Sequence, residues 1–159
     1  MSKRTRTTKN SAFQRLKALA DELNFRPHNI RDLVDPEGRH REVLTPEFPF
    51  LIRLFHQTAE THTASLTWHE RLELMMPLDG RCRERMGDEI IDLEPGDLLV
   101  VDNMELHQVV SFPGFDTRVI VLTFTPEFVC SLQSMPSDQA LLAPFYHGKG
   151  LRLNHKHTK

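Results

Sequence analysis

The sequence has little cysteine and no long apolar run, and each shortage excludes a class of protein. Cys82 and Cys130 are the only two cysteines among 159 residues, too few for the disulfide framework of a small secreted domain. We expect both to be free thiols in a reducing cytoplasm. No apolar stretch is long enough to span a bilayer. The basic N-terminus is not followed by the apolar segment that a secretory signal requires.

A strong excess of charge is also missing. The formal net charge is −2, and charged residues make up 26% of the chain, so we expect no general attraction to nucleic acid. The aromatic residues are ten Phe against one Trp and one Tyr, which favours an apolar core. With 39% hydrophobic residues, the chain is long enough to form one globular domain.

The N-terminal third combines a helix with a connecting segment. Residues 1–10 are polar and basic and are predicted to form a solvated tail. Residues 11–23 are predicted to form an amphipathic helix, with Ser11 and Gln14 at capping-box spacing. Residues 27–49, here called the connector, contain four of the ten prolines. We expect the connector to run over the surface.

From residue 50 the hydrophobic pattern has a period of two, as in β-strands. Strands are predicted at 51–55, 64–68, 72–78, 81–86, 89–93, 98–101, 108–112 and 119–124. Their length of about five residues and spacing of about ten favour a barrel or sandwich over alternating strands and helices. Pro126 is suited to the first position of a helix that follows.

Two segments contain the polar residues of a candidate site. In the first, His69 precedes Glu73 by four residues, and Gly80 follows; in the second, the turn 95–97 precedes His107. If the chain turns between His69 and Glu73, the two side chains face each other across neighbouring strands. His107 on a later strand then completes a face of two His and one carboxylate, which suits Zn, Fe, Mn or Ni.

In spacing, these segments resemble the two motifs of the cupin superfamily, over residues 50–124. The resemblance implies an all-β fold: a cupin double-stranded β-helix (jelly-roll) barrel with an N-terminal helix and short C-terminal helices. The chain departs from the metal-binding pattern at Thr67, where a further His is usual, and at Ser111, where Asn is usual. Three roles for His69, Glu73 and His107 therefore stay open. They are polar residues bonded to one another or to a ligand, ligands of a structural metal, or ligands of a catalytic metal.

The sequence WHERLEL at 68–74 resembles the start of the barrel in the sensor domains of AraC-type transcription regulators. Segments 123–128 and 141–145 resemble the helices that follow that barrel. The resemblance implies an effector-sensing domain, not an enzyme, that binds a small molecule in the barrel. The residues expected to bind it are Trp68, His69, Glu73 and His107. No cofactor is expected, and the alternative is a divalent metal (Zn, Fe, Mn or Ni) at the last three. The alternatives are a stand-alone metal-dependent cupin enzyme, such as a dioxygenase or isomerase, and a barrel that only mediates dimerisation.

The resemblance also implies a domain organisation. We divide the chain into a basic arm, helix and connector at 1–48, the barrel at 49–125, and a C-terminal helical segment at 126–159. In that family a pair of helix-turn-helix units follows, and no such pair is found after Pro144. DNA contact is therefore expected only through a DNA-binding domain absent from this chain. A cytoplasmic location is expected, no membrane partner is, and a homodimer is an open option.

Overall fold

The computed structural model describes residues 7–23, 30–57, 66–110, 116–130, 140–146 and 151–153. The strands are β1 (Phe50–Gln57), β2 (Leu72–Asp79), β3 (Cys82–Met86), β4 (Glu89–Leu93), β5 (Leu98–Val101), β6 (His107–Val110), β7 (Thr117–Phe124) and β8 (Leu151–Leu153). The helices are α1 (Thr7–Glu22), α2 (Pro126–Val129) and the short 3-10 helices η1 (Ile30–Leu33) and η2 (Ala143–Phe145). Within these ranges, no helix has the length and apolar content needed to cross a membrane.

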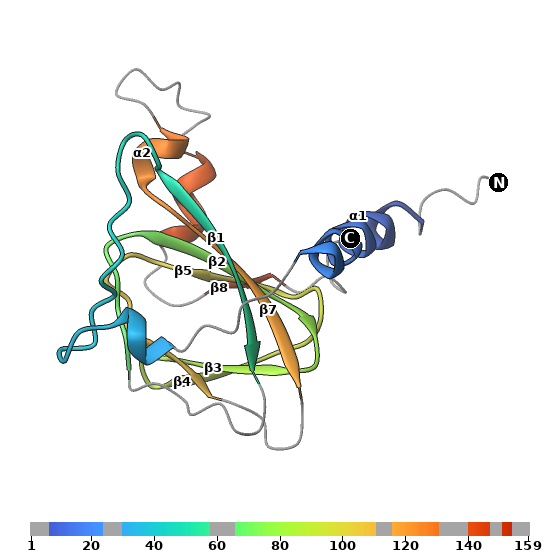
Figure 1. The fold of residues 1–159 in the computed structure, drawn as a ribbon, viewed down its shortest axis with the longest axis horizontal. Helices are drawn as coiled ribbons and strands as arrows, with labels where there is room; N and C mark the ends of the chain where they lie inside the picture. Colours follow the sequence, from blue (N-terminus) through green and yellow to red (C-terminus); the bar gives the residue numbers. More distant parts are fainter. Residues whose placement is uncertain are drawn as a thin grey trace.

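The strands form two antiparallel sheets. The larger sheet has the order β1-β7-β2-β5-β8, and the smaller has the order β4-β3-β6. In Figure 1, β3 and β4 lie below the larger sheet, and α1 projects to one side. Every strand pair is antiparallel, which confirms the predicted all-β architecture.

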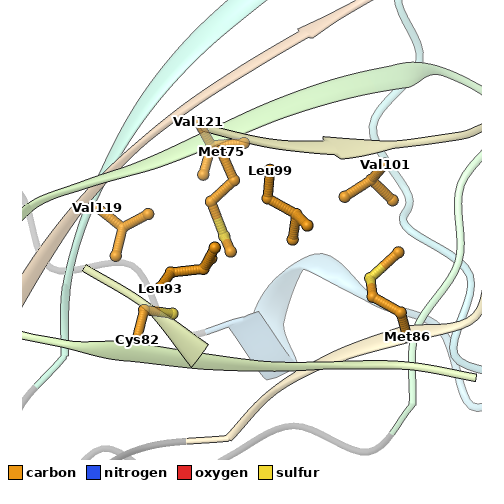
Figure 2. Packing of buried hydrophobic residues seen from close by; sticks show 8 residues of the cluster. All are labelled: Met75, Cys82, Met86, Leu93, Leu99, Val101, Val119 and Val121. Atoms are coloured by element: carbon orange, nitrogen blue, oxygen red, sulfur yellow. The ribbon is translucent and has the colours of Figure 1, made fainter. Parts of the chain in front are cut away.

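Apolar side chains from both sheets fill the space between them (Figure 2). The larger sheet contributes Met75, Leu99, Val101, Val119 and Val121, and the smaller sheet contributes Cys82, Met86 and Leu93. Each is at most 7% exposed. Burying a side chain of this kind stabilises a fold by about 1.5–3 kcal/mol. The period-two pattern places these residues inward, because successive side chains of a strand point to opposite faces.

The outer face of the larger sheet has a second apolar cluster. Leu72, Val100 and Phe124 pack there against Leu142 and Phe145 from the segment after the barrel. The helix predicted to open at Pro126 is observed, with a single turn to Val129. Strand β8, which pairs with β5, lies in the segment predicted to be helical. Three residues are too few to show a period in the sequence.

Helix α1 begins at Thr7, four residues earlier than predicted. The proposed cap at Ser11 is wrong, because Ser11 lies inside the helix. Ion pairs attach α1 to the barrel: Lys17 pairs with Asp79, and Asp21 lies 2.6 Å from Arg118. Lys17 and Asp21 are four residues apart and therefore lie on the same side of the helix.

Two other expectations need correction. Thr67 and Trp68 form only isolated bridges, to His107 and Arg39, rather than a strand. The connector is not simply a surface segment, because His40 is only 9% exposed and Arg39 forms a bridge to Trp68. The predicted tail residues 1–6, and the predicted strand residues 64–65 and 111–112, lie outside the described residues, as do 131–139 and 154–159.

Candidate functional site

The structure brings together three of the predicted site residues: His69, Glu73 and His107. One nitrogen or carboxylate oxygen from each lies within 4.8 Å of the others, and all three side chains are buried. Glu73 lies in β2 and His107 begins β6. His69 precedes β2 and is separated from it by the predicted bend at 70–71. The predicted convergence of the triad is therefore observed, although His69 does not lie in a neighbouring strand.

Backbone pairing explains why His69 and His107 meet. Thr67 N donates to the carbonyl of His107 at 2.8 Å, and His107 N donates back to Thr67 O at 3.0 Å. The hydroxyl of Thr67 also donates to the carbonyl of His107 at 3.4 Å. Thr67, at the position where metal-binding cupins have a further His, thus aligns the two segments rather than offering a ligand.

Both imidazoles of the triad are fixed in one tautomer by backbone carbonyls. His69 Nδ1 lies 2.8 Å from the oxygen of Arg71, and His107 Nδ1 lies 2.9 Å from the oxygen of Glu105. A carbonyl only accepts, so each Nδ1 donates, and each neutral ring has a lone pair at Nε2. This is the arrangement that orients His ligands in metal sites.

The charge state of the triad suits a cation as well. Burial raises the pKa of Glu73, but a second proton on His69, which would lie at Nε2 beside the carboxylate, outweighs it with smaller contributions from the charges of His107 and His40 and lowers that pKa. Burial is the main cause that lowers the pKa of His107. An ionised carboxylate and neutral imidazole are the forms that bind metal, and an arriving ion would take the place of the proton between His69 and Glu73. The donor set therefore fits a divalent ion.

His40 is a site residue that the sequence did not indicate. Its ring centroid lies 5.3 Å from that of His69 and 6.1 Å from that of His107. His40 Nδ1 lies 3.0 Å from Nη2 of Arg71, and a guanidinium only donates, so the proton of the neutral ring is on Nε2. Burial, with the charge of Arg71 as the second cause, lowers the pKa of His40 to about 3. His40 is therefore a neutral imidazole that can donate from Nε2, whereas His69 and His107 donate from Nδ1.

Through Arg71, this histidine is connected to a glutamate and a second arginine. Arg71 is 6% exposed, and its Nη2 lies 3.4 Å from Oε2 of Glu42 in the connector. Arg53 of β1 pairs with Oε1 of the same carboxylate. Arg53 is in register with Val121, a core residue, so its side chain starts from the inner face of the sheet.

Glu84 brings a second buried carboxyl group into the barrel from β3. It alternates with the more exposed Arg83 and Arg85, and this alternation was the signal that could have found it. Burial, with the charge of Glu73 as the second cause, raises the pKa of Glu84 well above its ordinary value. These surroundings therefore favour the uncharged form of the Glu84 carboxyl group.

Buried polar atoms without a partner are concentrated in this region. Among the described residues, seven buried side-chain atoms have no hydrogen-bond partner: His40 Nε2, Arg53 Nε, Arg53 Nη1, His69 Nε2, Arg71 Nε, Glu84 Oε1 and Glu84 Oε2. Leaving such a group unsatisfied costs about 1–3 kcal/mol. Four of these atoms are donors, and His69 Nε2 presents a lone pair. Because the protein itself does not supply hydrogen-bond partners for these atoms, the region is suited to bind a ligand.

Trp68 lies beside the triad rather than in it. The guanidinium of Arg39 lies over its half-buried ring, 5.5 Å from the centroid. Its backbone binds the connector, since Trp68 N donates to Gly38 O and His40 N donates to Trp68 O, both at 3.0 Å. A role for the ring in ligand binding stays a prediction.

Known proteins share this fold. A family profile described as "AraC-like ligand binding domain" matches residues 49–147. ToxT from Vibrio cholerae is 13% identical with a TM-score of 0.52, and the match covers 69% of this chain and 43% of ToxT. An RmlC-like cupin family protein with a double-stranded β-helix fold, from Methanocaldococcus jannaschii, is 10% identical with a TM-score of 0.46, over 52% of this chain and 74% of that one. A search of curated proteins finds no match.

The structural likeness to ToxT and the family match support different conclusions. At 13% identity the likeness to ToxT shows the fold alone, and this chain spans less than half of the ToxT chain. Together with the two antiparallel sheets, the family match confirms the predicted cupin double-stranded β-helix barrel. The family profile covers more than half of the sequence, and it confirms the predicted relationship to AraC-type sensor domains. The chain belongs to the family of AraC-like ligand binding domains.

Proposed function

We propose that this domain senses a small-molecule effector, which binds among the polar side chains around His69. The observation that carries the proposal is the gathering of seven unpartnered buried atoms in one region of the barrel. An effector that meets these atoms gains hydrogen bonds that the protein alone does not make. ToxT, which has the same fold, has been solved with (E)-4-(8-methylnaphthalen-1-yl)but-3-enoic acid bound, and a small organic effector is the corresponding expectation here.

The predicted contacts are those from His69, Glu73 and His107, with Trp68 beside them. Occupancy then changes how the connector and the segments after the barrel pack, and a DNA-binding module outside this chain detects that change. Such coupling requires only that the effector prefer one of two packings. A homodimer, a cytoplasmic location and DNA contact through a separate module stay predictions from the sequence.

A divalent metal is compatible with this function. His69 and His107 would bind it through Nε2 and Glu73 through its carboxylate, as their fixed tautomers and charge favour. When bound, the ion would supply a Lewis-acidic position at which an effector oxygen can bind. The same tautomers favour the second candidate function, a stand-alone metal-dependent cupin enzyme, and we rank it below the sensor because of the family match.

A ligand screen by thermal unfolding tests the sensor. The parent and a His69→Ala, His107→Ala double variant are compared with metal ions, organic acids, sugars and aromatic compounds. We expect an effector to raise the melting temperature of the parent by several degrees and to leave the double variant unchanged. The exposed Glu70→Ala substitution is the control and should keep the effect. Equal stabilisation of the parent and the double variant by every active compound would contradict the proposed location.

Elemental analysis of the same proteins separates the two functions further. The sensor needs no resident metal, so we expect less than about a tenth of an equivalent in the parent, and no loss of folding with a chelator. About one equivalent of Zn, Fe, Mn or Ni in the parent, absent from the double variant, would promote the metal-dependent enzyme.

A further inference from the structure

Glu42 joins two arginines that come from different parts of the barrel. One oxygen of its carboxylate pairs with Arg53 in β1, and the other lies 3.4 Å from Nη2 of Arg71. Arg71 also donates from Nη1 to the backbone oxygen of Glu42 at 3.3 Å. The three side chains are largely buried, with exposed fractions of 19%, 17% and 7% for Glu42, Arg53 and Arg71. A single carboxylate thus bridges two guanidinium groups inside the protein.

The two arginines have more donors than this carboxylate satisfies. Nε and Nη1 of Arg53 and Nε of Arg71 are buried and have no acceptor. His40, two residues before Glu42, adds an unpartnered donor at Nε2 and contacts Arg71 through Nδ1. All four atoms are N–H donors, so the group they lack is an oxygen acceptor. A carboxylate is the acceptor that guanidinium groups bind best, because it can take two parallel hydrogen bonds.

The other nearby acidic groups do not supply that acceptor. Glu73 influences Arg71 through its charge, but its Oε2 lies against His69 at 3.2 Å. Both oxygens of Glu84 are themselves among the atoms without a partner. The four donors are therefore still available to a ligand.

We propose that the effector carries a carboxylate, and that this group binds Arg53, Arg71 and His40 by displacing the side chain of Glu42. The inference rests on the proposed function, since it names the chemical class of effector for the same site. While no effector is bound, the carboxylate of Glu42 takes the place of the effector carboxylate and balances the positive charges of Arg53 and Arg71. A free carboxylate that takes its place meets donors that Glu42, held by its own backbone, leaves unmet.

Displacement of Glu42 has a consequence for the connector. Upstream, the chain is held by the two backbone bonds between Trp68 and the pair Gly38 and His40. Downstream, Thr45 and Phe48 bond to each other, and the residues Val43 and Phe48 are 81% and 76% exposed. The ion pairs of Glu42 and the bond from Arg71 to its backbone oxygen therefore hold residues 42–48 to the barrel, and an acidic effector that breaks the ion pairs loosens this stretch.

Chemical rescue tests the carboxylate site without knowledge of the effector. Glu42→Ala removes the internal carboxylate, and sodium acetate is the probe that replaces it. In sodium chloride, we expect the variant to melt several degrees below the parent. In sodium acetate of equal concentration, we expect most of that loss to be regained. Because no internal competitor remains, acetate should bind the variant at least about tenfold more tightly than the parent.

Three further variants make the result specific. Glu70→Ala removes the exposed ion pair with Arg39, of 2.9 Å, and acetate should not affect it more than chloride does. Arg53→Met added to Glu42→Ala should abolish the rescue. If Glu42→Ala does not fold, Glu42→Gln keeps the size of the side chain and one acceptor, and supplies folded protein for the same comparison.

Each outcome bears on a separate claim. Acetate that stabilises Glu42→Ala no more than chloride does overturns the carboxylate site. If a neutral effector is then found whose stabilisation depends on His69 and His107, the proposed function stands without the acidic effector. If acetate rescues Glu42→Ala but every effector stabilises the His69→Ala, His107→Ala variant as well, the carboxylate site stands and the proposed function fails.

Discussion

Nε2 of His69 lies 3.2 Å from Oε2 of Glu73, although Nδ1 of the same ring is already committed to the carbonyl of Arg71 at 2.8 Å. A neutral imidazole has one proton, and the carbonyl requires it at Nδ1. While His69 is neutral, its contact with Glu73 therefore joins two acceptors, which repel unless a further proton or a metal ion lies between them. Buried at 2% and 6% exposure, this pair is poorly suited to stabilise the fold by itself and well suited to bind a cation or a donor group of a ligand.

Glu84→Gln is expected to stabilise the protein at neutral pH, by an amount that grows as the pH rises. Burial and the charge of Glu73 raise the pKa of Glu84 well above its ordinary 4.5. Above pH 4.5, the ordinary pKa, Glu84 of the unfolded chain has lost its proton while Glu84 of the folded protein still binds it. The stability that Glu84 contributes therefore falls with rising pH. An amide does not titrate and avoids this loss. Melting curves should nearly coincide at about pH 4 and separate by several degrees at about pH 8.

The control for this experiment is Glu127→Gln, at an exposed position of α2, which should change the free energy of unfolding by less than about 0.5 kcal/mol. A Glu84→Gln variant that is less stable than the parent at about pH 8 would contradict the account, since it would mean that the ionised carboxylate stabilises the fold.

The two cysteines should differ sharply in reactivity. Burial, with the charge of Glu84 adding to it, raises the pKa of the Cys82 thiol above its ordinary 9.0, and only the thiolate attacks a disulfide reagent. Cys82 is 1% exposed, whereas Cys130 is half-buried. We expect dithiobis-nitrobenzoate to modify Cys130 in the native protein and Cys82 only after unfolding. A Cys130→Ser variant should lose the native reaction, and rapid modification of both thiols in the parent would refute the prediction.

Gly38→Ala should loosen the connector. The residue has φ +82°, and a Cβ there would lie 2.6 Å from the carbonyl oxygen of Leu66. Gly87 is the matched control, because it has φ +56° but its Cβ would come no closer than 3.9 Å to Glu105. Both substitutions incur the left-handed backbone penalty of about 1–2 kcal/mol, and only Gly38→Ala adds a clash with backbone. Urea unfolding should therefore show a loss at least about 1 kcal/mol larger for Gly38→Ala, and equal losses would count against the connector geometry.

The barrel and the triad could be predicted because their signals are local. Period-two alternation predicted the strands that contain Met75 and Val121, two residues of the observed core. The spacing of His69, Glu73 and His107 within two motifs predicted that they converge, as observed. The strand prediction was wrong at 67–68, where only isolated bridges form, and at several strand ends. It also missed β8, whose three residues paired with β5 are too few to show a periodic pattern.

The other half of the site could not be predicted, because it depends on contacts between distant segments. His40 and Glu42 lie in a connector with no hydrophobic period, and nothing in their neighbours indicates burial. Arg53 stands in a strand whose apolar residues suggested only a core role. Its pairing with Glu42 appears when the connector folds against β1.

The central claim is that the polar cluster serves a ligand rather than the fold. Replacement of the triad by apolar residues of similar size, as His69→Leu, Glu73→Met and His107→Leu together, tests it most directly. The free energy of unfolding is measured in urea, in metal-free buffer, for this variant and the parent. We predict that the triple variant is as stable as the parent within about 1 kcal/mol, or more stable, because buried charged groups are often replaced by apolar ones without loss. A loss of more than about 3 kcal/mol, with far-UV circular dichroism unchanged, would contradict the claim and make the cluster a structural network.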